Sequence, residues 1–304
     1  MISRRDWLGR VGGGMAGAMA WGGFSGAGGA MRGIAAPAAW GEKGKAALDL
    51  MTFNLRYASA TGANRWPLRR PCVAGVLREA LPDVVGTQEG LYGQLKDIGS
   101  DLPELGWIGL GRDGGSRGEF MAVFYRRERL EPVEYDHFWL SDTPEVIGST
   151  SWGNTNRRMV TWVTFEDRAT GRRFQFWNTH FDHQVEEARR KSAALVVARM
   201  AKVPASMPVV LAGDFNALSG ASRSYEILTG EGGLKDTWHA AAARSEEDAN
   251  SFNGFAPLER KGQRIDWILS RGAARVAGAG VVTTRVDGQW PSDHCPVTAR
   301  LEWA

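Results

Sequence analysis

Five apolar segments of the sequence each run directly into a short polar cluster that contains a carboxylate, an amide or a histidine. The clusters are Asn54, Gln88-Glu89, Asn178-Thr179-His180, Asp214 with Asn216, and Asp293-His294. Polar groups at strand ends converge on one rim of a sheet, where sheet proteins build their sites. The sequence therefore predicts one polar site assembled from segments that are far apart in the chain.

The side chains in these clusters are mostly carboxylates and amides, whose hard oxygen atoms suit Mg²⁺ or Mn²⁺. His180 and His294 lie among them, but the sequence lacks the H-E-x-x-H spacing that holds zinc in many hydrolases. A divalent cation beside carboxylates and a histidine is suited to phosphoester hydrolysis, because the metal neutralises the phosphoryl oxygens while a base prepares water.

Several of these residues also have simpler interpretations. Asp214 could form an Asx turn that ends a strand. His294 could be a capped residue of a surface loop, and its neighbour Cys295 leaves a thiol hydrolase open as an alternative. Asp266 stands in an apolar run at 265–269, where a buried carboxylate is costly without a partner, so we expect it to have one.

The segments that must position these residues are mainly predicted strands. β-rich runs cover residues 48–55, 120–125, 160–165, 174–179 and 209–212. The clearest helical period covers 185–201, and shorter helices are predicted near 70–79, 94–101 and 222–228. Strands that outnumber helices and pair partly as hairpins favour an α+β sandwich over a regular βαβ barrel. We expect one domain at 48–304, after a linker at 39–47.

Six short motifs carry a resemblance to a known family. They are Thr52-Phe53-Asn54, Gln88-Glu89, Asn178-Thr179-His180, Gly213-Asp214-Phe215-Asn216, Arg264-Ile265-Asp266 and Ser292-Asp293-His294. In this order they resemble the endonuclease/exonuclease/phosphatase superfamily, the group typified by pancreatic deoxyribonuclease. The resemblance covers essentially the whole predicted domain. It implies a DNase I-like fold, a four-layer α/β/β/α sandwich of two packed mixed β-sheets with the site at one edge.

The same resemblance implies roles for the metal-binding and phosphate-binding residues. Glu89 resembles the principal ligand of Mg²⁺ or Mn²⁺, and Asn54 and Asp293 resemble the residues that complete or support the metal site. Asn216 would hold a phosphate oxygen, and Asn54 also belongs to the implied phosphate-binding set. Arg157 is our candidate for a phosphate clamp, because a guanidinium can bind two phosphate oxygens at once. A solvated loop arginine is the alternative for Arg157.

The catalytic roles follow from the resemblance as well. Asp214 would orient or deprotonate the attacking water, and His294, held in its tautomer by Asp266, would act as general base or as an acid facing the phosphate. His180 would stabilise developing charge or help protonate the leaving group, with Glu119 supporting it. Both histidines and Asn216 are assigned to catalysis without fixing which histidine is the acid.

Departures from the better-known branches narrow the substrate. Ala217-Leu218 and Arg264-Ile265-Asp266-Trp267 differ from the motifs of the inositol-polyphosphate 5-phosphatases. The motif Phe138-Trp139-Leu140-Ser141-Asp142-Thr143-Pro144 is most similar to secreted bacterial members whose substrates are mostly unassigned. We therefore expect a phosphodiesterase or phosphatase acting on a small-molecule, nucleotide or lipid-headgroup phosphoester. A secreted nuclease is the alternative, and a non-catalytic binding module is a second one.

The first residues predict export. Arg4-Arg5 precede a long uncharged stretch of Gly, Ala, Met and Trp, which is typical of a twin-arginine signal peptide, here residues 1–38. Ala36-Pro37-Ala38 offers a cleavage site, and Ala18-Met19-Ala20 an earlier one. The stretch is too weakly apolar for a stable membrane span. We expect a periplasmic or secreted monomer that uses the twin-arginine machinery; a disordered Gly/Ala tail is the alternative.

Charge and cysteine content bound the function further. Loss of residues 1–38 removes four of 37 basic and one of 34 acidic residues, so 33 of each remain and the net charge of +3 disappears. A nuclease that follows backbone phosphates usually has a basic stripe, so long nucleic acid is a disfavoured partner. Cys72 and Cys295 alone cannot form a zinc ribbon, and whether they pair stays open.

The export prediction is tested by changing the arginine pair. Because the export address is read from both arginines, Arg4→Lys combined with Arg5→Lys should strand the precursor in the cytoplasm. Fractionation and immunoblotting measure this. An unchanged yield outside the cytoplasm would show that residues 1–38 are not a twin-arginine signal.

Overall fold

In a computed structural model of the protein, residues 40, 42–272 and 275–303 are described. The predicted signal peptide at 1–38 lies outside these residues. Within the described part of the chain, no helix combines the length and apolar character needed to cross a membrane.

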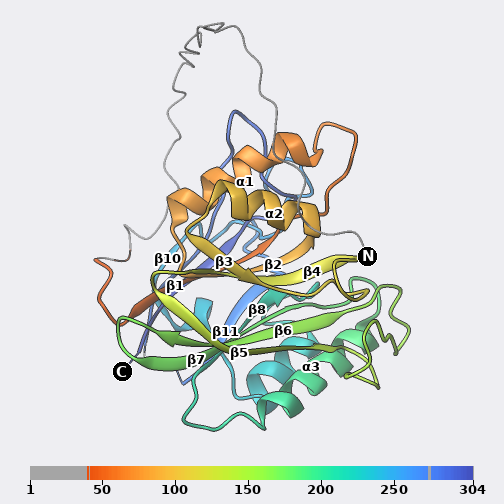
Figure 1. The fold of residues 1–304 in the computed structure, drawn as a ribbon, viewed down its shortest axis with the longest axis vertical. Helices are drawn as coiled ribbons and strands as arrows, with labels where there is room; N and C mark the ends of the chain where they lie inside the picture. The colour runs from red at the N-terminus through yellow and green to blue at the C-terminus, as the bar shows by residue number, and fades with distance from the viewer. Residues whose placement is uncertain (1–39, 41, 273–274, 304) are drawn as a thin grey trace, which may run out of the picture. The chain divides into compact units, whose positions relative to one another are not determined.

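Two mixed β-sheets form the centre of the fold (Figure 1). The seven-stranded sheet has the order β10-β12-β13-β1-β2-β4-β3, and the six-stranded sheet has the order β5-β6-β7-β8-β11-β9. The strands of the first are β1 Ala47–Asn54, β2 Val84–Leu91, β3 Leu105–Ile108, β4 Glu119–Arg126, β10 Ala241–Ser245, β12 Arg275–Val281 and β13 Val297–Glu302. Those of the second are β5 Leu130–Trp139, β6 Met159–Asp167, β7 Arg172–His180, β8 Val209–Asp214, β9 Lys235–Asp236 and β11 Asp266–Arg271.

Helices cover the outer faces of both sheets. α1 (Trp66–Ala80) and α2 (Tyr92–Asp101) lie against the seven-stranded sheet, and α3 (Glu186–Met200) lies against the six-stranded sheet (Figure 1). The short α4 (Arg223–Glu226) continues into a π-helical turn at Ile227–Glu231, and α5 is Thr237–Ala240. The predicted four-layer α/β/β/α sandwich is confirmed. α1 begins four residues before the predicted 70–79, because Pro67 suits the first turn of a helix.

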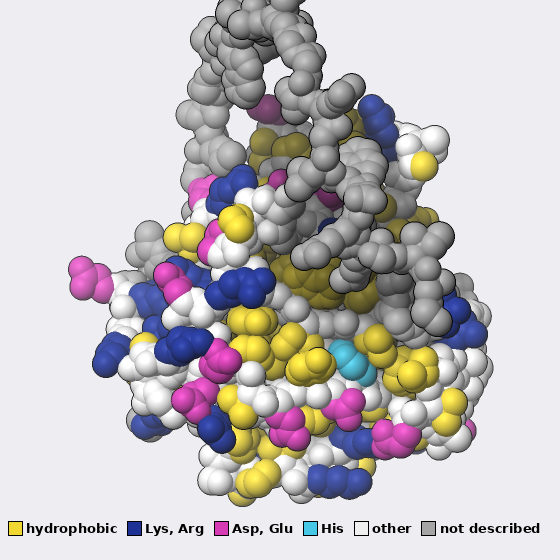
Figure 2. Space-filling model, in the orientation of Figure 1, with side chains coloured by type: hydrophobic (Ala, Val, Ile, Leu, Met, Phe, Trp, Pro, Cys, Tyr) yellow, Lys and Arg dark blue, Asp and Glu magenta, His cyan; other side chains and the backbone are white. Residues whose placement is uncertain are grey.

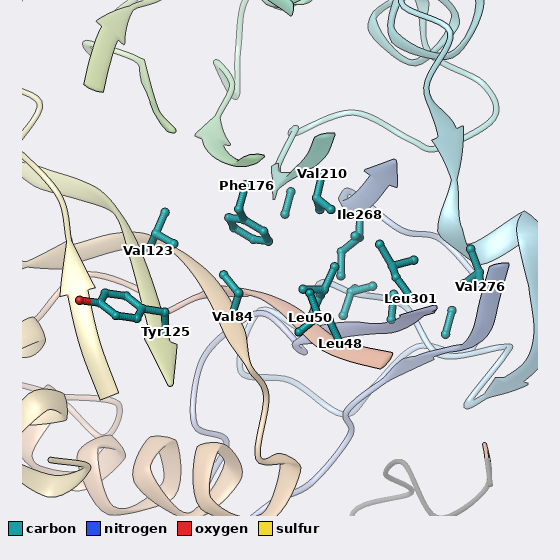
Figure 3. Close-up of a cluster of buried hydrophobic side chains, with 14 of the residues drawn as sticks. Leu48, Leu50, Val84, Val123, Tyr125, Phe176, Val210, Ile268, Val276 and Leu301 are labelled. Atoms are coloured by element: carbon teal, nitrogen blue, oxygen red, sulfur yellow. The ribbon is translucent and has the colours of Figure 1, made fainter. Parts of the chain in front are cut away.

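The core between the sheets is built from alternate residues of the central strands. Leu48 and Leu50 of β1 belong to it, whereas Met51 and Phe53 pack under the helices on the outer face. Figure 3 shows Leu50 near Val210 and Ile268 of the other sheet. Because both faces of these strands are buried, most of their side chains are apolar, and the polar groups that form the site stand at their ends.

The same alternation places the predicted site residues. Each of three site residues stands four positions after a core residue of its own strand and therefore on the same, inner face. The pairs are Leu50 and Asn54, Phe176 and His180, and Val210 and Asp214. In the sheet register, His180 pairs with Asp214 across β7 and β8, and Asp214 pairs with Asp266 across β8 and β11. Three chemically active side chains therefore stand in one row across neighbouring strands. A one-residue slip of any strand would turn its member away from the others.

A fully buried arginine in α1 fixes the loops around this row. The Arg69 guanidinium donates to five main-chain carbonyls, those of Asn64 (2.7 Å), Leu55 (2.6 Å), Pro291 (2.9 Å), Arg56 (2.9 Å) and Tyr57 (3.3 Å). These carbonyls belong to the loop after β1, the turn before α1 and the loop before β13. Arg69 therefore ties the segment that follows Asn54 to the segment that precedes Asp293.

Removing this guanidinium should destabilise the fold strongly. Arg69→Met leaves five carbonyls, two of them fully buried, without their donor, so we expect the free energy of unfolding to fall by about 3 kcal/mol or more. Arg70→Met is the matched control, because Arg70 makes surface ion pairs with Asp97 and Asp101 and should cost less than about 1 kcal/mol. Urea denaturation measures both. Equal losses would contradict the assigned role of Arg69.

Candidate active site

A cavity of about 500 Å³ opens where the strand ends meet. The predicted site residues that line it are Glu89, Glu119, His180, Asp214, Asn216, Asp293 and His294. Asn54 and Asp266 lie buried behind this wall and contact it through hydrogen bonds. The structure thus brings nine of the ten predicted site residues together. The exception is Arg157, whose guanidinium contacts Gly148 and Asp113 instead.

Asp214 connects the other groups. Its Oδ2 accepts a hydrogen bond from Asn54 Nδ2 (2.9 Å) and lies 3.4 Å from His180 Nε2 and 3.8 Å from His294 Nε2. Its Oδ1 accepts from the backbone N–H of Asn216 (2.9 Å). Asp214 therefore forms the predicted Asx turn through Oδ1 and faces the two histidines through Oδ2. Burial, together with Asp266, raises the pKa of Asp214 to about 7, although His294 opposes the shift.

His294 is held by a carboxylate behind it. Its Nδ1 lies 3.0 Å and 3.2 Å from the two oxygens of Asp266, so Nδ1–H donates to Asp266 and Nε2 faces Asp214. Burial alone would lower the pKa of His294, but the charges of Asp266 and Asp214 outweigh it and raise the pKa to about 10. This shift favours the protonated imidazolium at neutral pH. Asp266 thus has the partner that its apolar surroundings required.

His180 has the opposite electrostatic setting. Burial, followed by the charges of Arg158 and Arg112, lowers its pKa well below the ordinary value, so the ring is neutral. Asn216 Nδ2 donates to His180 Nε2 (3.0 Å), which places the ring proton on Nδ1. Across the described residues, that buried Nδ1 has no hydrogen-bond partner.

The expected support of His180 by Glu119 is absent. The Glu119 carboxylate accepts from Arg112 Nη1 at 2.5 Å instead. A guanidinium is the stronger partner for a carboxylate than a neutral imidazole, which explains the exchange. Glu119 therefore lines the cavity as the partner of an arginine, and its role as a direct contact of His180 is corrected.

A second part of the cavity lining is acidic. Glu89, in a left-handed backbone conformation (φ 60°), accepts from Asn54 Nδ2 (3.1 Å) and from the backbone N–H of Tyr57 (3.2 Å). Burial and then the charge of Glu89 raise the pKa of Asp293, against the charges of His294 and Arg56. Arg56 is the nearest cation, and its nitrogens lie 3.8 Å from Glu89 and 3.6 Å from Asp293.

This acidic part of the lining fits a divalent cation. Among the described residues, two groups of carboxylates and histidines have ligand atoms within 4.8 Å of one another: Glu89 with His180 and Asp214, and Asp214 with Asp266 and His294. Neighbouring carboxylates that repel one another, and whose nearest cation is the half-exposed Arg56 at 3.6–3.8 Å, are suited to a hard cation. In the second group a proton already joins His294 to Asp266, so the Glu89 side carries the freer oxygens.

The cavity also has a cationic wall for which the sequence gave no clear signal. Arg158 and Arg112 form it, beside His180 and His183. Arg157, the predicted clamp, instead donates to Gly148 O (2.7 Å) and Asp113 Oδ1 (3.1 Å) and is half-exposed. The register at the start of β6 decides which of the two neighbouring arginines, Arg157 or Arg158, faces the cavity. This register cannot be read from the sequence Arg157-Arg158 itself.

The Phe252 ring packs edge-on against the His294 ring, with 5.0 Å between centroids. Its loop, between β10 and β11, offered no sequence signal for this contact.

Cys72 and Cys295 are buried free thiols, and burial raises the pKa of Cys295 to about 12. A neutral, enclosed thiol is a poor nucleophile, which counts against the thiol hydrolase.

Comparisons with known proteins agree with this geometry. The family model described as the endonuclease/exonuclease/phosphatase family matches residues 51–294. A member of that family from Bacteroides vulgatus is 35% identical, with a TM-score of 0.80 over 85% of this chain and 99% of that one. The Bacteroides thetaiotaomicron mannosyl-6-phosphatase is 34% identical, with a TM-score of 0.78 over 84% and 100%.

A further relative is an uncharacterised protein of Acanthamoeba polyphaga mimivirus. It is 26% identical over 177 residues, which are 56% of this chain and 66% of that protein, just under two thirds of its length. The family match spans most of the chain and includes each of the strand ends described above. This protein belongs to the endonuclease/exonuclease/phosphatase family.

Proposed function

We propose that this protein is an exported, Mg²⁺- or Mn²⁺-dependent phosphoesterase that acts on a small phosphorylated molecule. Enzymes of its family are metal-dependent phosphoester hydrolases. The observation that carries the proposal is the cavity itself, which brings the Glu89 and Asp293 carboxylates, two histidines and the Arg158 and Arg112 guanidinium groups around one space. A phosphoryl group needs all three kinds of contact.

Glu89 and Asp293 would hold the cation, with Asn54 supporting Glu89. A bound Mg²⁺ or Mn²⁺ supplies neutralisation of the phosphoryl oxygens. The oxygen donors favour these ions over zinc, since the described cluster contains no thiolate and its histidines are engaged by Asp266 and Asn216.

The chain's own residues divide the acid–base work. Asp214, with a pKa near neutrality, orients water through Oδ2 and takes its proton. The His294 imidazolium, fixed by Asp266, directs its Nε2–H at a phosphoryl oxygen and stabilises the charge that develops there. The amide of Asn216 donates to His180 Nε2 and to Phe181 O, so it orients the His180 ring, and it would have to release one of these contacts to hold a phosphate oxygen.

Phosphorylated sugars are the first substrate class to examine. The similar protein from Bacteroides thetaiotaomicron is a mannosyl-6-phosphatase. A cavity of about 500 Å³ is of the size that takes a small molecule. Figure 2 shows basic and acidic side chains interspersed on the face that it presents. Export through residues 1–38 would place the enzyme among substrates outside the cytoplasm.

Activity should require a divalent cation, because Glu89 and Asp293 can neutralise a phosphoryl group only through one. EDTA should abolish turnover of the purified mature chain, and Mg²⁺ or Mn²⁺ should restore it. The assay panel is mannose 6-phosphate, p-nitrophenyl phosphate, bis-p-nitrophenyl phosphate, sphingomyelin and plasmid DNA. Full activity in the stripped protein, or rescue by Zn²⁺ alone, contradicts the metal assignment, and preferred cleavage of DNA supports the nuclease instead.

Asp214, Asp266 and His294 should act as one unit. Removing any one should lower kcat by about a hundredfold or more, the scale of a positioned acid or base. In His294→Ala, Asp266 has no ring to orient, so adding Asp266→Asn should cost little beyond the single change. Steady-state kinetics of the single and double variants measure the coupling, and fully additive losses would separate the two residues.

The matched control is Cys295→Ser. This change alters the residue next to His294 but leaves the imidazole and its carboxylate in place, so most activity should remain. Loss of activity in Cys295→Ser together with survival in Asp214→Asn would restore the thiol mechanism.

A further inference from the structure

Arg158 is an enclosed guanidinium with spare hydrogen-bonding capacity. It is 3% exposed and lines the active-site cavity. Its Nη2 donates to His183 Nδ1 at 3.2 Å, which makes His183 an acceptor at that atom. Its Nε and Nη1 have no acceptor among the residues that the structure describes. Buried donors without acceptors are costly, so an arginine in this state is prepared for a ligand that supplies oxygen atoms.

Structural pairing with Asp182 does not account for Arg158. The nearest approach, Nε to Asp182 Oδ2, is 4.0 Å, which is an ion pair without a hydrogen bond. The other oxygen of Asp182 is occupied by the backbone N–H groups of Gln184 (2.9 Å) and Val185 (2.7 Å), which hold the turn before α3. Asp182 therefore offsets charge near Arg158 but leaves its Nη1 unsatisfied.

A second cation stands beside Arg158. Arg112 lines the same cavity, and its charge, after burial, is the largest influence that lowers the pKa of Arg158. Arg112 is itself paired with Glu119 through Nη1. Both arginines also lower the pKa of His180, so all three groups share one electrostatic region. That region shares the cavity with Glu89 and Asp293, and its two guanidinium groups attract an anion.

We propose that Arg158, assisted by Arg112, binds the free oxygens of the phosphoryl group and selects phosphomonoesters over phosphodiesters. The inference rests on the proposed phosphoesterase function and specifies its substrate class. A monoester presents three unsubstituted oxygens and, above its second ionisation, two negative charges. In a diester one of those oxygens carries an alkyl group and one charge is lost. The guanidinium therefore loses an acceptor, an ionic contact and the space that the substituent occupies.

The test compares two ligands that differ by a single methyl group. Methyl phosphate and dimethyl phosphate are titrated by calorimetry into the Mg²⁺-loaded chain at about pH 8, where the monoester is doubly charged. The wild-type chain should bind methyl phosphate at least about tenfold more tightly. Arg158→Met should abolish this preference by weakening methyl phosphate alone, and Arg158→Lys should keep part of it, since it keeps the charge without the planar fork.

Two arginine controls accompany these variants. Arg157→Met should bind both ligands as the wild type does, because its guanidinium is directed at Gly148 and Asp113. Arg172→Met removes a positive charge at the exposed, opposite end of β7 and corrects for the change in net charge. A loss of the preference in Arg157→Met, or its survival in Arg158→Met, overturns the assignment of Arg158.

Turnover separates this inference from the proposed function. The wild-type kcat/KM should be higher for p-nitrophenyl phosphate than for bis-p-nitrophenyl phosphate, and Arg158→Met should reduce that ratio by about tenfold or more. If no phosphoester is hydrolysed while the binding preference for methyl phosphate persists, the proposed function fails and the Arg158 site stands. If phosphoesters are hydrolysed with a preference for diesters, the function stands and the Arg158 inference fails. A melting temperature for each variant verifies that it is folded.

Discussion

The concentration of carboxylates at one end of the inter-sheet core is the constraint on which the structure depends. Asp214, Asp266 and Asp293 are buried there, with Glu89 half-buried beside them. Like charges in a low-dielectric region are tolerated only with cations and hydrogen-bond donors close by. The protein supplies the His294 imidazolium, the Asn54 amide and the Arg69 guanidinium. A divalent cation would neutralise the negative charge that remains. The register of the sheets, the paths of the loops and the position of α1 together bring these charged groups close to one another.

Much of this arrangement could be predicted from the sequence. Apolar strands that end abruptly in polar residues, such as the one ending at Asp214, indicated both the sandwich and the rim on which the polar groups gather. The pairing of His294 with Asp266 followed from family motifs and from the cost of burying Asp266. These inferences succeeded because strand alternation is a local property, which a sequence records directly.

The features that were missed depend on distances between segments that the sequence does not contain. Glu119 pairs with Arg112 because a glycine-containing loop returns the chain beside it, and Arg158 rather than Arg157 faces the cavity because of the register at β6. Arg69 has no motif of its own, since its partners are carbonyls that every residue possesses. Site residues on regular strands were therefore easier to predict than those on loops or in the flanking helix.

The contacts of Arg69 with main-chain carbonyls bear on how this protein can change its substrate range. Because Arg69 binds main-chain carbonyl oxygens, its contacts do not depend on which side chains those residues carry. Arg56 and Tyr57, both held by Arg69, also line the cavity. Substitutions at these two positions can reshape what the cavity accepts while the main chain, and with it the spacing of Asn54 and Asp293, stays where Arg69 holds it. Substrate range can thus evolve in the side chains independently of the catalytic framework.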